Sequence, residues 1–260
     1  MNTLVVTTSH KARPETVRHA EDFARSWDIG FIDRNDRPIE ELLRTFDSAL
    51  IVTNDDKQLA TADGILKSHL GTAFIRLKSV SRGEGDPLIR AGDLQPGDQV
   101  VDTTFGLGRD ALIAACAVGP TGSVTGLESS LPLFHLARHG LVDGPFSPAQ
   151  VKADFGLDAA PTTVEHVDAR EWLRMAEANS ADVVFVDPMF STPKTSDTGF
   201  GLLRSVADLS PLDRSWVDEA RRVARRCVVV KCGPSKPWFE SAGLELIQGH
   251  SNANWWRASN

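Results

Sequence analysis

The sequence has little of the chemistry that stabilises small secreted proteins or membrane spans. Its 260 residues contain three cysteines and no tyrosine. Cys116, Cys227 and Cys232 are odd in number and lie in apolar segments, which is typical of reduced thiols and indicates neither a disulfide framework nor a zinc site. No apolar run approaches the roughly 20 residues that cross a bilayer, and the N-terminus lacks a signal-peptide layout. We therefore expect a soluble, cytoplasmic protein with no membrane segment and no metal site.

The charge balance weighs mildly against broad nucleic-acid binding. The formal net charge is −7, whereas nonspecific binding depends on cations that neutralise phosphates. Three basic clusters could still serve locally as phosphate contacts, or could simply be solvated faces: Lys11, Arg13 and Arg18; then Arg76, Lys78, Arg82 and Arg90; then Arg221, Arg222, Arg225 and Arg226.

The apolar pattern divides the chain into three parts. Residues 1–58 alternate strand-like and helical runs and predict a small N-terminal α/β domain. Residues 59–97 are interrupted by glycines and are expected to form a connector on the substrate side. In residues 98–260, apolar strands near 99–103, 123–127, 163–167, 182–186 and 226–231 alternate with helices, which predicts a mostly parallel sheet covered on both faces. Residues 244–249 and 253–258 are expected to add a C-terminal antiparallel hairpin.

A glycine-rich turn follows the first of these strands, from Asp102 to Asp110. Gly106 and Gly108 allow a tight turn and close backbone approach to a ligand, and a helix start follows with free N–H groups. With Ala111 the turn also fits the dinucleotide fingerprint, and Glu128 lies about 20 residues beyond the turn, where it could bind ribose hydroxyls.

Two residues of this turn bear on the choice of cofactor. The acid at Asp102 favours S-adenosyl-L-methionine, because it can reach the ammonium of that cofactor but would face a pyrophosphate unfavourably. Arg109 could pair with the carboxylate of the same cofactor, or with Asp110 or Glu128.

Acids also follow two later strands. Asp168 could accept a hydrogen bond from an adenine amino group, or could cap the helix that starts at the next residues. Asp187 begins the sequence Asp-Pro-Met-Phe. An exocyclic amine is a poor nucleophile because its lone pair is delocalised. Acceptors for its hydrogens, here the Asp187 carboxylate and the Pro188 carbonyl, direct that lone pair toward a methyl donor. Phe190 could stack on the base, or could be ordinary core.

These stretches resemble the RsmJ-like family of class I S-adenosylmethionine-dependent methyltransferases, which act on the exocyclic N2 of a guanine in 16S ribosomal RNA. The similarity runs from about residue 72 to 238 and includes the turn at 102–111, residues 187–190, 203–212 and 228–231. It implies a Rossmann-like methyltransferase sheet and an RNA partner, the 16S RNA or the small ribosomal subunit. It also implies cofactor contacts from Arg109, Asp110, Glu128, Ser129, Asp168, Ala169 and Asp187. Residues 1–58 look more like uncharacterised bacterial relatives of that family.

Other functions stay open at this point. The same Asp-Pro-x-aromatic chemistry serves adenine in DNA and amide nitrogen in proteins. A nicotinamide-dependent oxidoreductase could use the glycine turn and Glu128, although its proton donor could not be a tyrosine. A non-catalytic RNA-binding module with the same fold is a third hypothesis.

Overall fold

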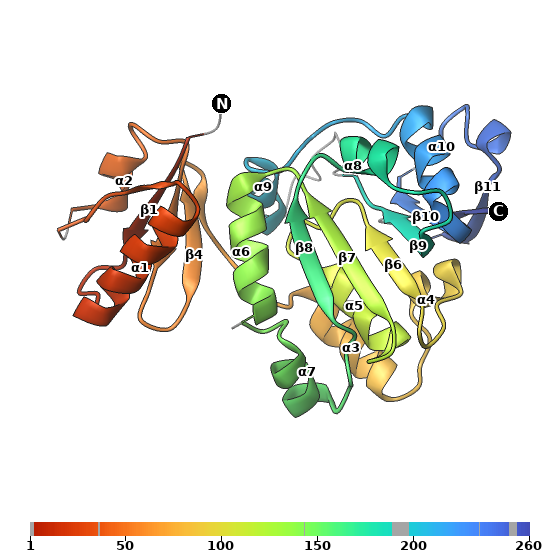
Figure 1. The fold of residues 1–260 in the computed structure, drawn as a ribbon, viewed down its shortest axis with the longest axis horizontal. Coiled ribbons are helices and arrows are strands. Elements are labelled where there is room, and N and C mark those ends of the chain that lie inside the picture. Colours follow the sequence, from red (N-terminus) through yellow and green to blue (C-terminus); the bar gives the residue numbers. More distant parts are fainter. Residues whose placement is uncertain (1–2, 36, 143, 189–197, 234, 250–253) are drawn as a thin grey trace.

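The computed structural model describes residues 3–35, 37–142, 144–188, 198–233, 235–249 and 254–260. It contains two sheets that lie side by side (Figure 1). The first has five strands in the order β2-β1-β3-β4-β5, and the second has seven in the order β11-β12-β10-β9-β6-β7-β8.

The N-terminal sheet combines parallel and antiparallel pairs. β1 (Leu4–Thr8) lies between β2 (Gly30–Phe31) and β3 (Ser48–Val52), parallel to both, and β4 (Lys57–Thr61) and β5 (Gly64–Lys67) extend it as an antiparallel hairpin. Helix α1 (Pro14–Ser26) has proline in its first turn and buries Thr16, Ala20 and Ala24, one helical turn apart, against the sheet. Helix α2 (Ile39–Leu42) is a single turn.

Regular structure fills residues 59–97, where the sequence indicated a connector. β4 and β5 belong to the first sheet, and helices α3 (Thr72–Ser81) and α4 (Pro87–Gly92) contact helix α5 (Arg109–Val118) of the second unit. The apolar pattern of residues 59–97 is weak for a physical reason. Phe74 and Ile75 on α3 are 41% and 70% exposed, so apolar residues are not confined to its buried face.

The second sheet confirms the predicted mostly parallel arrangement with a C-terminal antiparallel hairpin. β6 (Gln99–Asp102), β7 (Ser123–Glu128), β8 (Thr162–His166), β9 (Ala181–Val186) and β10 (Ala224–Cys232) pair in parallel. β12 (Asn254–Ser259) runs antiparallel to both β10 and β11 (Leu244–Gly249). The chain starts this sheet at β6 and later returns to the other side of β6 with β9, so the strand order reverses there, which is where parallel sheets bind ligands.

Helices cover both faces of this sheet. α3, α4 and α5 pack on one face, and α8 (Ala169–Met175) and α10 (Arg214–Val223) pack on the other, each forming a buried apolar cluster. α6 (Leu131–Val142) stands between the two sheets in Figure 1. The remaining helices are α7 (Pro148–Phe155), α9 (Thr198–Arg204) and the short η1 (Glu240–Ala242). Within the described residues, no helix is long and apolar enough to cross a membrane.

Candidate active site

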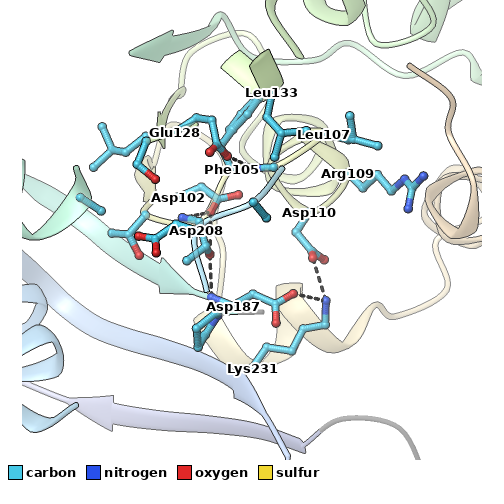
Figure 2. Close-up of a pocket in the computed structure, with 18 of the residues that line it drawn as sticks. Asp102, Phe105, Leu107, Arg109, Asp110, Glu128, Leu133, Asp187, Asp208 and Lys231 are labelled. Atoms are coloured by element: carbon cyan, nitrogen blue, oxygen red, sulfur yellow. Dashed lines mark hydrogen bonds and ion pairs between the residues drawn. The ribbon is translucent and has the colours of Figure 1, made fainter. Parts of the chain in front are cut away.

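A pocket opens at the carboxyl ends of β6, β7 and β9, and Figure 2 shows many of the side chains that line it. Most residues that the sequence singled out meet there although they come from different strands. The lining includes Asp102, Gly106, Arg109, Asp110, Glu128, Ser129, Asp168, Ala169, Asp187 and Pro188. Gly108 is not part of the lining, and Phe190 lies outside the described residues.

The glycine turn is shaped by the packing of one aromatic ring. Gly106 and Gly108 both have positive φ, +55° and +75°. A Cβ at Gly108 would lie 2.8 Å from the Phe105 ring, and one at Gly126 on β7 would lie 1.8 Å from it. The ring therefore occupies the space that side chains at these glycines would need, and Gly108 fixes the turn at the start of α5 without lining the pocket.

Glu128 ties the turn to the end of β7. Its Oε2 accepts the Gly106 N–H at 2.8 Å and its Oε1 accepts the Ser130 N–H at 2.8 Å. Burial raises the pKa of this carboxyl to about 7, although these backbone donors oppose the rise. Each carboxylate oxygen has a second lone pair, so the side chain can bind a ligand hydroxyl while it holds the turn.

Asp102 is almost fully buried beneath the pocket, with 2% exposure. Its Oδ1 accepts the Thr104 N–H at 3.0 Å, and the Thr104 hydroxyl in turn accepts the Asp187 N–H at 2.7 Å. Burial raises the pKa of Asp102 to about 8, and the neighbouring carboxylates of Asp110 and Asp187 add to the rise. The group is therefore mostly protonated at neutral pH, and a cationic ligand would favour its ionised form.

Asp168 caps helix α8. Its Oδ1 accepts the Arg170 N–H at 2.7 Å, so the capping role that the sequence left open is present. The carboxyl also lines the pocket beside Ala169, and its contact with adenine stays a prediction.

Arg109 lies beside the segment that joins the two sheets. Its Nη2 is 3.2 Å from Nε2 of His69, and its Nε donates to the His69 carbonyl at 3.3 Å. In Figure 2 its side chain extends away from Asp102 and Asp187.

A chain of charged groups crosses the floor of the pocket. Lys231 donates to Asp187 at 2.6 Å and to Asp110 at 2.8 Å (Figure 2). Arg76 on α3 donates to the other oxygen of Asp110 at 2.5 Å, and holds Asp86 with two hydrogen bonds of 2.7 and 2.9 Å. In the sequence, Arg76 is only one member of a basic cluster, and no motif distinguishes Asp86. No local pattern links Arg76 to Asp110, which is 34 residues away.

The ion pairs shift the pKa values of Asp110 and Asp187 in opposite directions. Burial alone would raise the pKa of Asp110, but Lys231 and Arg76 outweigh it and hold that pKa well below the usual range. Burial raises the pKa of Asp187 to about 6; Lys231 opposes this rise and Asp110 adds to it. The pocket lining holds six acids and four bases, so it is negative when all are ionised: Asp102, Asp110, Glu128, Asp168, Asp187 and Asp208 against Arg76, Arg109, Arg170 and Lys231.

Comparison with known proteins shows the family of the chain. A family model described as "Putative SAM-dependent methyltransferase" matches residues 43–248. The chain belongs to this family. It is 34% identical to the uncharacterised protein YpiP of Bacillus subtilis (strain 168), over 94% of both chains.

Further relatives carry a named activity. The chain is 38% identical over 173 residues to Ribosomal RNA small subunit methyltransferase J of Rhodopseudomonas palustris (strain HaA2), covering 60% of this chain and 73% of that protein. The protein of that name from Laribacter hongkongensis (strain HLHK9) is 36% identical over 130 residues, covering 48% of this chain and 43% of that protein. A SAM-dependent methyltransferase of known structure from Neisseria gonorrhoeae shares the fold, with a TM-score of 0.62, 17% identity and coverage of 98% and 95%.

The methyltransferase uses S-adenosylmethionine, and its pocket fits that cofactor. The cofactor carries a sulfonium and an ammonium as well as one carboxylate, and the six acids of the pocket lining outnumber its four bases. Because the chain belongs to this family, the glycine turn is assigned to S-adenosylmethionine and not to a dinucleotide. Among the described residues, no group of three or more His, Cys, Asp or Glu side chains could hold a metal ion.

Proposed function

We propose that this methyltransferase modifies the exocyclic N2 amine of a guanine in the RNA of the small ribosomal subunit. The named activity of the ribosomal RNA relatives supports the substrate class. The observation that carries the chemistry is the position of Asp187 and Pro188, directly after β9 and on the wall of the pocket.

In this proposal Asp187 accepts an N–H of the target amine. Its backbone is held by Thr104, so the carboxylate has a fixed place at the strand end. Acceptors on the amine hydrogens localise the nitrogen lone pair and orient it for in-line attack. S-adenosylmethionine supplies the electrophilic methyl group. With a pKa of about 6, Asp187 is mostly ionised near pH 7.5 and can also take the proton that the amine loses. The Pro188 carbonyl is proposed as the second acceptor and Phe190 as the stacking surface.

The cofactor contacts are proposed from the same pocket. Asp102 would hold the ammonium, Glu128 the ribose hydroxyls and Asp168 the adenine amino group. The backbone of the glycine turn and its helix start would approach the rest of the cofactor, and the remaining proposed contacts are Gly106, Arg109, Asp110, Ser129 and Ala169. Gly108, which does not line the pocket, would act by shaping the turn.

We also propose a division of labour along the chain. Residues 1–58 would form most of an N-terminal unit, whose sheet continues through β4 and β5 to Lys67. Residues 98–260 would form the methyltransferase unit, and residues 59–97 would supply the substrate side. In support of the last, Thr72 and Arg76 from α3 line the pocket.

The test uses tritium-labelled S-adenosylmethionine with unmodified 16S RNA, free and assembled into small subunits. The product is digested to nucleosides, and we expect N2-methylguanosine. Asp187→Asn should lower kcat by about 10²–10³-fold, since it removes the charged acceptor. Asp182→Asn is a matched control, because Asp182 lies at the opposite end of the same strand, pairs with Arg225, and is 22% exposed compared with 20% for Asp187.

Three outcomes would contradict the proposal. N6-methyladenine formed in a DNA substrate would move the activity to another base, and a methylated amide in ribosomal protein would move it to protein. Near-normal turnover by Asp187→Asn with the guanine product unchanged would remove the proposed mechanism.

A further inference from the structure

Lys231 occupies an unusual position for a lysine at the end of a buried strand. An ammonium has three hydrogens, and two of them go to Asp110 and Asp187. The side chain is 21% exposed, lines the pocket, and lies with its Nζ 5.3 Å from the centre of the Trp255 ring. That ring is itself stacked on Phe185 of β9. The ammonium therefore lies between the Trp255 ring and the pocket, next to Asp187, the proposed acceptor for the amine.

We propose that Lys231 is a substrate-positioning residue, anchored by Asp110, which holds the Asp187 carboxylate and donates its third hydrogen to the acceptor atom next to the target amine. This inference rests on the proposed function. In guanine the N2 amine is bonded to a carbon that also carries the ring nitrogen N3, an acceptor. A carboxylate and an ammonium 2.6 Å apart offer the matching acceptor and donor.

Asp110 serves as the anchor in this arrangement. One of its oxygens accepts from Lys231 and the other from Arg76, which two bonds to Asp86 fix in place. The Asp110 side chain therefore acts through Lys231, while its backbone at the start of α5 remains available to the cofactor. We expect Asp110→Asn to leave the cofactor Kd within about threefold of wild type.

The two neighbours of Asp187 act on its acidity in opposite directions, which supplies a sharp test. The groups that interact with it are Lys231 on β10, Asp110 on α5, Arg76 on α3, Asp102 on β6 and the Cys232 thiol. Removal of the Lys231 cation leaves the repulsion from Asp110, so the pKa of Asp187 should rise. Removal of the Asp110 charge should lower it.

The experiment compares Lys231→Met, Lys231→Arg and Asp110→Asn with wild type. Lys152→Met is the control, since Lys152 lies on the remote helix α7 and pairs with Asp158 on the surface. We expect Lys231→Met to raise KM for RNA by at least about tenfold, with the cofactor Kd within about threefold. At saturating S-adenosylmethionine, where the ionisation of Asp102 no longer limits cofactor binding, the acid limb of the pH profile of kcat/KM for RNA should move to higher pH in Lys231→Met, to lower pH in Asp110→Asn, and stay in place in Lys152→Met. Lys231→Arg keeps the positive charge, so its acid limb should lie at the same pH as that of wild type.

A titration of the Asp187 carboxyl, followed by carboxyl ¹³C NMR and assigned by its loss in Asp187→Asn, repeats the test without any substrate. If wild type methylates no RNA, the proposed function fails, and this titration still decides the Asp110–Lys231–Asp187 arrangement. An Asp187 signal that titrates alike in wild type, Lys231→Met and Asp110→Asn would overturn the inference. So would a Lys231→Met variant that loses thermal stability and cofactor affinity together while its acid limb stays unchanged.

Discussion

Asp102 gives the clearest test of whether a buried acid of this pocket lowers the stability of the fold while it contributes to cofactor binding. The group is 2% exposed, and its pKa lies at about 8 in the folded chain compared with the usual 3.8. Between these two values the unfolded chain has lost its proton and the folded chain keeps it. The folded state therefore binds more protons, and stability falls as the pH rises from about 4 to about 8.

Replacing Asp102 by Asn removes this cost and keeps an oxygen that can accept the Thr104 N–H. A pKa that rises from 3.8 to about 8 corresponds to at most roughly 6 kcal/mol, at pH 8 or above. Relaxation around the buried charge reduces that figure. We expect Asp102→Asn to stabilise the protein by about 2–4 kcal/mol at pH 8 and by close to zero at pH 4.

Urea unfolding at pH 4.5, 6 and 8 measures this difference, and calorimetry with S-adenosylhomocysteine measures the cost to binding. That ligand keeps the ammonium that Asp102 is proposed to hold. In wild type its binding should release a proton and should tighten about tenfold from pH 6 to 7 and about fivefold from pH 7 to 8, because only the ionised fraction of Asp102 is competent and its pKa is about 8. In Asp102→Asn the affinity should be weaker and independent of pH in this range.

Two results would refute the reasoning. If Asp102→Asn is less stable than wild type at pH 8, the carboxylate is held by more favourable contacts than its burial suggests. If wild-type affinity does not change with pH while the stability effect is present, Asp102 is buried for structural reasons and does not meet the cation of the cofactor.

Two further predictions concern single residues in or next to the pocket. Gly108→Ala should destabilise the protein by about 2–4 kcal/mol in urea unfolding, since it combines a positive φ with a Cβ 2.8 Å from the Phe105 ring, whereas Gly156→Ala, with φ +68° and open space, should cost only about 1 kcal/mol. Equal losses in the two variants would mean that the ring moves aside easily. Asp168→Ala should lose about 1 kcal/mol of stability as well as cofactor affinity, and Asp168→Ser should recover only the stability because serine also caps helices. Recovery of both by serine would leave Asp168 with a capping role alone.

Local sequence was sufficient to predict the sheet and most of the pocket. The runs before Asp102 and Asp187 are almost wholly apolar, as expected for central parallel strands, and acids that follow such strands necessarily meet at one sheet edge. The ion pairs of Arg76 could not be predicted in this way, because they depend on how α3 packs on α5.

The contacts of the basic cluster at the end of α10 and the start of β10 also could not be predicted from the sequence. The sequence left two interpretations of these arginines, phosphate contacts or a solvated face. In the structure they bind acceptors on other helices and strands. Arg221 donates to the carbonyl of Ala242, and Arg222 to that of Ala176. Arg225 and Arg226, at the start of β10, pair with Asp182 and Asp98. Only tertiary packing supplies these acceptors, so the sequence could not distinguish structural arginines from free ones.

The N-terminal sheet contributes directly to the shape of the cofactor turn. Leu59 on β4 and Leu66 on β5 share a buried apolar cluster with Leu107, the residue between the two turn glycines, and with Leu133 on α6. Leu107 and Leu133 also line the pocket. Leu107 is 4% exposed within this cluster, so the first sheet helps to bury the turn that the Phe105 ring also shapes. The family match from residue 43 includes β3, β4 and β5 as well as the methyltransferase unit, which is the extent expected if the hairpin and the turn form one structural piece.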